Sequence, residues 1–300
     1  MASQRDVKNK INSVQNIQKI TRALETVAAA RLRRAEQRIA ALRPYAGAIR
    51  RMTRQAARAA GAETARLPLL QQHDSERNVG LLLVTGDRGL AGGFNSQIIR
   101  AGVRIASELG GEGKHPAWYA AGRRGVSSIS FRGYELSGSY TGFADRPAYA
   151  DARSIADDLI TGYVDGKLDR VEIVYNAYIS PLTQRVTREQ LLPLSHATIA
   201  GEEDEEQDEQ AAGPRALVEY EPGPEELLRR LIPDYIEISI YRALVESTAG
   251  FFGAQMTAMR SASDNAGTLI TDYTLEMNRA RQAEITQEIA EVVAGAEGLS

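Results

Sequence analysis

A glycine-rich segment, Gly86 to Asn95 (GDRGLAGGFN), is the part of the sequence closest in composition to a chemical site. It lies between an apolar run, Val79 to Thr85, and a predicted helix that reaches about Leu109. Glycine loops in such a place bind phosphate through free amides and the helix N-terminus. This loop lacks the Walker Lys-Ser/Thr pair and the G-x-G-x-x-G spacing, and no acidic residue stands where a ribose contact is expected. We therefore favour a loop that presents Asp87 and Arg88 to a protein partner.

The other residues that could do chemistry do not form a constellation. His73, His115 and His196 have no metal-ligand spacing, and we expect surface or hinge positions for them. The adjacent acids Asp157-Asp158 and Glu225-Glu226 point to different sides of a helix, so neither is a general acid/base couple. The absence of cysteine excludes disulfides and thiolate chemistry. We expect no catalytic residue, cofactor or metal site, and a mechanical or adhesive role.

Strand and helix signals alternate through a central domain at about 75–200. After the apolar run, strands are expected at 117–121, 134–140 and 171–179, a helix at about 148–163, and an edge strand at 186–192. Alternating strands and helices predict an α/β fold with an open, mainly parallel, Rossmann-like sheet covered on both faces.

Both ends of the chain are predicted to be long helices. The first runs from Ser3 to Arg43 within an N-terminal segment at 1–60, and the second from Tyr235 to Glu297 within a segment at 225–297. At about 1.5 Å per residue they give rods of roughly 60 and 90 Å, too long to lie on a domain about 30 Å across. A long antiparallel two-helix coiled coil is the simplest solution, with amphipathic helices folded back on the central domain as the alternative.

The apolar stripes of these helices include many small side chains, which favours an irregular, closely packed coil over a regular zipper. The stripe residues are Val7, Ile11, Val14, Ile17, Ile20, Leu24, Val27 and Leu32 in the first helix and Ile240, Leu244, Phe252, Met256, Met259, Leu269, Tyr273 and Met277 in the second.

Charge is distributed unevenly along a chain whose net charge is −3. Residues 1–60 contain 14 Lys/Arg and three acidic residues, which indicates an anionic partner. The opposite charge gathers at 202–209 (EEDEEQDE), within a segment at 201–214 that we interpret as a solvated mobile loop, with a cation site as a remote alternative. Neither a signal peptide nor a transmembrane run is expected, which predicts a cytosolic location, compatible with binding to a membrane assembly.

Three motifs, at both ends and near the middle of the chain, resemble the gamma subunit of bacterial F-type ATP synthases. They are VQNIQKITRALETVAA at 14–29, TGDRGLAGGFN at 85–95, and 259–288 with ASDNAG and NRARQAEITQE. The second departs from the family pattern by an additional Gly86 and by Ala91 in place of a frequent cysteine. The resemblance implies a rotor shaft inside a ring of three alpha and three beta subunits, with an α/β foot on the membrane c-ring beside epsilon. It also implies a peripheral location on the cytoplasmic face of the bacterial inner membrane.

Site residues follow from the resemblance only where the sequence matches. Arg281, Gln282 and Thr286 match a polar cluster that touches the beta subunits, and Asp87, Arg88 and Gly89 match a loop that faces the catalytic subunits. The resemblance implies that the apolar end of the last helix rotates inside an apolar sleeve of the surrounding subunits. The residues of this end are Ile285, Ile289, Val292 and Val293, and packing on the first helix is the alternative use of the same residues. Tyr220 and Glu221 resemble positions that face the c-ring, whereas Gln255 replaces a frequent arginine. The resemblance also implies that the basic first helix faces the acidic lever of the family's beta subunits, which carries the opposite charge.

Two other classes of protein fit parts of the sequence. A nucleic-acid-binding coiled coil would explain the basic first helix, but the helix has only Tyr45 nearby for stacking and the chain carries an acidic region, so we expect no nucleic acid partner. A dinucleotide-dependent enzyme would use the central sheet, but the glycine-rich loop lacks the residues and spacing that bind a dinucleotide.

Overall fold

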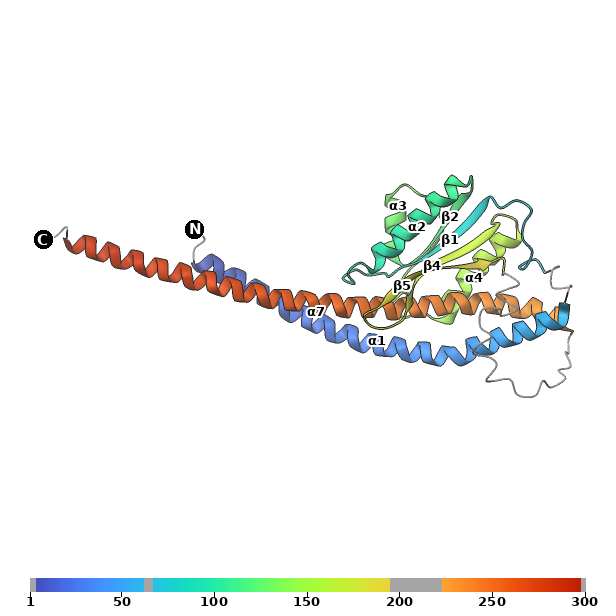
Figure 1. Ribbon diagram of the computed structural model, residues 1–300, viewed down its shortest axis with the longest axis horizontal. Helices are drawn as coiled ribbons and strands as arrows, with labels where there is room; N and C mark the ends of the chain where they lie inside the picture. Colours follow the sequence, from blue (N-terminus) through green and yellow to red (C-terminus); the bar gives the residue numbers. More distant parts are fainter. Residues whose placement is uncertain (1–3, 62–66, 195–222, 298–300) are drawn as a thin grey trace. The chain divides into compact units, whose positions relative to one another are not determined.

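The computed structural model describes residues 4–61, 67–194 and 223–297 (Figure 1). The elements are α1 (Gln4–Ala60), β1 (Asn78–Val84), α2 (Phe94–Gly111), β2 (His115–Ala121), α3 (Arg123–Phe131), β3 (Leu136–Tyr140), α4 (Tyr149–Val164), β4 (Arg170–Tyr178), β5 (Gln184–Leu192) and α7 (Pro224–Glu297). The chain has two compact units. The coil unit contains α1 up to Ala30 and α7 from Gln255, and the sheet unit spans 31–254.

The sheet has the order β3-β2-β1-β4-β5. The pairs β1–β2, β2–β3 and β1–β4 are parallel, and β5 is antiparallel to β4 at one edge. Because β1 is central, Leu82 pairs with Tyr119 on one side and Ile173 on the other. The predicted open, mainly parallel α/β sheet is confirmed.

Helices cover both faces of the sheet. On one face α2 approaches so closely that a Cβ at Gly102 would lie 2.7 Å from Leu83 Cδ2, and in Figure 1 α2 and α3 lie together on this side. On the other face, Leu82 and Val84 join a core with Ile155 and Leu159 of α4. This double coverage explains why β1 is a continuous apolar run.

The inner parts of both long helices, which are 31–60 in α1 and 224–254 in α7, belong to this second core. Ile49 and Ala56 of α1, and Ile240 and Leu244 of α7, are buried in it. The alternative of amphipathic helices packed on the central domain therefore describes the inner parts of α1 and α7, whereas their outer parts form the coil. Each long helix serves two cores.

In the coil unit the two helices run antiparallel. Lys10 Nζ lies 5.7 Å from the ring centroid of Tyr273, Gln18 Nε2 donates to the Ser263 carbonyl at 3.2 Å, and Arg260 Nε donates to Glu25 at 2.8 Å. Residue numbers thus rise along one helix as they fall along the other.

The seam between these helices has a regular spacing of four and three. Its positions are Val7, Ile11, Val14, Gln18, Thr21, Glu25 and Ala28 in α1 and Met259, Ser263, Ala266, Ile270, Tyr273, Met277 and Ala280 in α7, all buried or half-buried. Such spacing is the coiled-coil pattern. The irregular coil that we predicted is therefore wrong in spacing, although the small residues are present. Ile17, Ile20, Val27 and Leu269 of the predicted stripes are 53%, 59%, 48% and 44% exposed, because they lie off the seam.

Helix bounds differ from expectation at three places. Helix α1 continues through Pro44 and α7 begins before Pro233. A proline removes one backbone hydrogen bond, and we attribute its tolerance here to the tertiary packing of the flanking turns, such as buried Ile49 and Ile236. Helix α3 was not predicted: Gly125 and three serines give it low helix propensity, and its position depends on a hydrogen bond from the Gly125 amide to Thr85 Oγ1 at 2.8 Å.

Candidate functional site

The ends of β1 and β2 are joined tightly at the start of the glycine-rich loop. Thr85 Oγ1 donates to the Ala121 carbonyl at 3.0 Å and accepts from the Gly125 amide. Gly122 has φ +98°, and a Cβ there would lie 2.1 Å from the Thr85 carbonyl oxygen. Only glycine fits this close approach.

The carboxylate of Asp87 organises the backbone around the loop. It accepts hydrogen bonds from the amides of Arg123 at 2.8 Å, Gly142 at 3.1 Å and Ala144 at 3.0 Å. We predicted Asp87 as a group presented to a partner. The structure gives its oxygens these three intramolecular donors, so its direct contact with a partner stays a prediction, and its role in holding the loop is the one supported by geometry.

Asn95 closes the loop from the other end. Its Oδ1 accepts from the Gly86 amide at 2.8 Å and its Nδ2 donates to the Arg88 carbonyl at 3.0 Å. The loop is thereby held at both ends by side chains.

Arg88 and Leu90 are the side chains that the loop exposes most. Arg88 is 66% exposed, with Nε 3.4 Å from Asp145 Oδ2, and Leu90 is 64% exposed. Gly89, also predicted to face a partner, lies against the guanidinium of Arg124.

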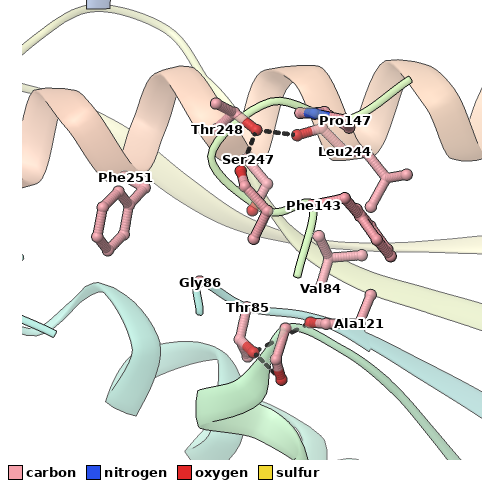
Figure 2. A pocket seen from close by; sticks show the side chains of 12 residues that line it. Val84, Thr85, Gly86, Ala121, Phe143, Pro147, Leu244, Ser247, Thr248 and Phe251 are labelled. Atoms are coloured by element: carbon pink, nitrogen blue, oxygen red, sulfur yellow. Dashed lines mark hydrogen bonds between the residues drawn. The ribbon is translucent and has the colours of Figure 1, made fainter. Parts of the chain in front are cut away.

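The crevice where a nucleotide binds in open α/β sheets lies at the carboxyl ends of the central strands. Here α7 fills it (Figure 2). A Cβ at Gly86 would lie 2.9 Å from the Phe251 ring, and Leu244, Ser247 and Thr248 complete the wall. The remaining cavity is about 10 Å³. That is about the space of one water, so a nucleotide phosphate has no room.

A larger hollow beside the loop is lined mainly by arginine, and we call it the arginine hollow. Its volume is about 230 Å³, and its lining consists of Arg31, Arg34, Ala35, Arg38, Asp145, Arg146, Thr248 and Phe252. Asp145 accepts from Arg31 at 3.1 Å and also pairs with Arg88. Within the described ranges, the guanidinium groups of Arg34, Arg38 and Arg146 make no side-chain hydrogen bond or ion pair, although the Arg146 backbone amide donates to the Phe143 carbonyl at 2.8 Å. The hollow is thus strongly positive and suits an anionic group.

The sequence spacing indicated only half of this hollow. Arg31, Arg34 and Arg38 are three and four residues apart, so one face of a helix was readable from the pattern. Asp145 and Arg146 come from a loop more than 100 residues away, and no local signal connects them with α1.

At the C-terminal part of α7, side chains 281–292 are all exposed. Arg281, Gln282 and Thr286 lie there, and Thr286 Oγ1 donates to the Gln282 carbonyl at 2.9 Å within the same helix. Ile285, Ile289 and Val292 are 44%, 60% and 72% exposed, so they do not pack on α1. The alternative prediction, that these three apolar residues pack on the first helix, is therefore wrong.

Several predicted residues lie outside the described ranges, namely Tyr220, Glu221, His196 and the acidic loop at 201–214. The backbone of Val293 is helical, but its side chain is not described.

His73 occupies a structural position before β1. Its Nδ1 lies 2.9 Å from Asp169 Oδ1 and its ring stacks on Tyr163 at 4.6 Å. Burial raises the pKa of Asp169, but hydrogen bonds from the Asn78 amide, His73 and the Arg77 amide outweigh it and hold the pKa below its usual value. His73 thus joins the segment before β1 to the sheet.

Two features are absent from the residues that the structure describes. No group of three or more potential metal ligands occurs among them. None of their helices is both long and apolar enough to span a lipid bilayer.

The described fold is thus a mainly parallel sheet whose crevice is filled by α7, a helix that continues into an antiparallel coil and ends with exposed side chains at 281–292. The sequence profile described as ATP synthase matches residues 3–299. ATP synthase gamma chains from Parafrankia sp. (strain EAN1pec) and Rubrobacter xylanophilus are 41% and 42% identical, and each match covers 100% of this chain and 99% of the relative. The chain therefore belongs to the gamma-subunit family of the F-type ATP synthases.

Solved structures share the fold at lower identity. A chain of the Euglena gracilis mitochondrial ATP synthase, in a structure of OSCP, F1 and c-ring, has a TM-score of 0.68 and 15% identity, covering 99% of this chain and 94% of that one. A chain of the Tetrahymena thermophila mitochondrial ATP synthase, in a structure of the central stalk and c-ring, has a TM-score of 0.59 and 23% identity, covering 81% and 99%.

Proposed function

We propose that this chain is the central rotor stalk of a proton-transporting ATP synthase. In this role it couples c-ring rotation, driven by proton flow, to ATP synthesis at the alpha/beta sites, and it regulates ATPase activity and proton flow. Besides family membership, the observation that carries the proposal is the end of α7, where 12 consecutive side chains from Arg281 are exposed in the described structure. A helix end of this kind needs a surrounding partner.

The proposed mechanism is mechanical, and the chain contributes no catalytic group of its own. A two-helix coil is not three-fold symmetric, so its faces meet three surrounding catalytic interfaces differently. Each rotor angle then favours a different conformation at each interface. Because the coil binds these conformations with different free energies, its angle sets the nucleotide affinity of each interface.

The partners are three alpha and three beta subunits around the coil. Arg281, Gln282 and Thr286 would contact beta subunits, and Ile285, Ile289 and Val292 would turn within an apolar sleeve. The off-seam residues Ile17, Ile20 and Val27 add an exposed apolar stripe on α1 that suits the inner wall of the same ring.

The sheet unit would contact several other subunits of the complex. We assign Arg88, Gly89 and the arginine hollow to the acidic lever of a beta subunit, because opposite charges attract across such a surface. Epsilon and the membrane c-ring are the other expected partners, with Tyr220 and Glu221 as candidate c-ring contacts. The protein would then be peripheral, on the cytoplasmic face of the bacterial inner membrane.

Reconstitution with cognate alpha and beta subunits tests this function. Size exclusion should give one chain per three alpha–beta pairs, with sustained ATPase activity that depends on the chain. The rotor function would be rejected by absence of a complex together with salt-sensitive binding to DNA or RNA, which would favour a nucleic-acid-binding coil.

A further inference from the structure

The arginine hollow is a cavity of the sheet unit, to which all of its lining residues belong. Arg31, Arg34 and Arg38 are three and four residues apart, so they lie on one face of α1. Buried Ala35 and Phe252 supply the apolar part of the lining. The guanidinium of Arg31 lies 5.5 Å from the centroid of the Phe252 ring, a cation–π contact that joins α1 to α7 at this place.

The loop that brings Asp145 and Arg146 to the hollow is fixed on both sides. The Thr248 hydroxyl of α7 lies 2.8 Å from the Ala144 carbonyl oxygen, and the Asp87 carboxylate accepts from the Ala144 amide at 3.0 Å. The backbone of this loop is therefore ordered before a ligand arrives, and little of its conformational entropy is lost on binding.

The one carboxylate in the lining shows that an oxyanion is bound there. Asp145 Oδ2 accepts from Arg31 Nη1 at 3.1 Å. The guanidinium groups of Arg34, Arg38 and Arg146 have no such partner among the described residues. Like charges repel, and a cavity lined by one sign of charge concentrates counter-ions, so these three groups favour a further anion.

The volume and charge of the hollow select among anions. Its volume of about 230 Å³ is roughly eight times the share of one water molecule in the liquid, which is enough for two phosphoryl groups. A phosphoryl group carries about −1.5 to −2 charges near pH 7, so two of them balance three guanidinium groups, whereas one carboxylate balances a single group. The planar guanidinium also donates paired hydrogen bonds to phosphate oxygens. A diphosphate therefore matches this hollow better than a monophosphate does.

We propose that the arginine hollow is a binding site for a diphosphate group, whose two sources are inorganic pyrophosphate and a nucleoside diphosphate such as ADP. Arg34, Arg38 and Arg146 bind the phosphate oxygens, and Arg31 stays paired with Asp145. The site is a different cavity from the filled crevice, where a phosphate has no room.

A diphosphate site has a consequence for the proposed function. The acidic lever of a beta subunit and a diphosphate compete for the same guanidinium groups, so a bound diphosphate weakens the docking of the lever. Binding of the diphosphate itself does not depend on the rotor function, whereas this competition rests on it.

Titration calorimetry of the full-length chain at physiological ionic strength, without magnesium, tests the site. Pyrophosphate should bind with a dissociation constant below about 1 mM, and phosphate and sulfate should bind about tenfold or more weakly because each carries less charge. ADP distinguishes the two sources. Affinity equal to that of pyrophosphate, with AMP about tenfold weaker, assigns the site to nucleoside diphosphates as well, whereas ADP binding about tenfold weaker than pyrophosphate assigns it to the inorganic anion.

A double variant, Arg34→Gln with Arg38→Gln, removes two of the three binding groups. It should weaken pyrophosphate binding about tenfold or more and leave the unfolding temperature unchanged, because neither guanidinium has a side-chain partner to lose in the described structure. The matched control is Arg33→Gln with Arg100→Gln, which removes the same charge at two exposed positions outside the lining. The control should keep the affinity within about twofold, since exposed charges at a distance are screened by salt.

Four results would overturn the inference. They are no binding of pyrophosphate below about 1 mM, equal affinity for sulfate, unchanged affinity in the Arg34→Gln, Arg38→Gln variant, and an equal loss of affinity in the control. The rotor function is unaffected by any of them, because assembly with alpha and beta subunits tests it separately. A chain that binds pyrophosphate in the hollow but does not assemble would refute the rotor function and leave the diphosphate site standing.

Discussion

Replacement of Asp87 by alanine should destabilise the isolated chain, because it leaves three backbone donors without their acceptor. The bonds, at 2.8, 3.1 and 3.0 Å, hold Arg123, Gly142 and Ala144. A hydrogen bond to a charged group contributes about 1.5–3 kcal/mol when buried, and less at a partly exposed site where water replaces the acceptor. At about 1 kcal/mol each, the loss is about 3 kcal/mol. Asp87→Asn keeps one acceptor oxygen and should lose about half as much.

Urea unfolding followed by tryptophan fluorescence measures this effect. The chain has one tryptophan, Trp118, which is 3% exposed in β2. Asp157→Ala on α4 is the control, because that carboxylate is exposed with no hydrogen bond or ion pair in the described structure, and a change within about 0.5 kcal/mol is expected. If Asp87→Ala were as stable as this control, the assigned role of Asp87 would be refuted.

Three further predictions use the same unfolding measurement. Phe251→Ala should cost about 3–5 kcal/mol, because it empties the filled crevice, and an unchanged stability would contradict that packing. Asp169→Asn should destabilise the chain above pH 5. Because the folded-state pKa is depressed, the contribution of Asp169 is present above its unfolded pKa of about 3.9 and disappears as pH falls through the folded value, so equal losses at pH 7 and pH 3 would contradict it. Met259→Asp, in the coil seam, should lower stability by about 3 kcal/mol or more and uncouple ATP turnover from proton transport, whereas Leu269→Asp should cost under about 1 kcal/mol. Normal proton pumping in Met259→Asp would count against the coil.

The filled crevice shows how a Rossmann-like sheet can hold a helix in the place of a nucleotide. Phe251 and Leu244 occupy the place where other α/β proteins bind a nucleotide. The sheet is thereby fixed to α7 and becomes a rigid mount for the helix. The glycines of the loop serve this packing, since Gly86 allows the Phe251 ring to approach.

Local patterns were sufficient for much of the fold. The apolar run at 79–85 predicted the central strand, and the alternation after it predicted a parallel sheet, because both signals depend on neighbouring residues. The two long helices were also predictable from periodicity. The unpredicted helix at 123–131 depends instead on the contact of Gly125 with Thr85, which no short window contains.

The site was less predictable because its contacts are long-range. The composition of the loop drew attention to it, but the sequence does not reveal that the Asp87 carboxylate accepts hydrogen bonds from amides 36 to 57 residues away. The seam was misjudged for another reason: Thr21 and Ser263 are buried while Ile17 and Ile20 are exposed, so hydrophobicity alone selected the wrong face of α1.

Rotation of the chain inside an immobilised alpha–beta ring is the most direct test of the rotor function. The sequence contains no cysteine, so Phe131→Cys, at a position 92% exposed, provides a unique thiol for a visible probe. With ATP supplied, the probe should turn in one direction with three equal pauses per turn. A probe that stays still while the complex hydrolyses ATP would contradict the account.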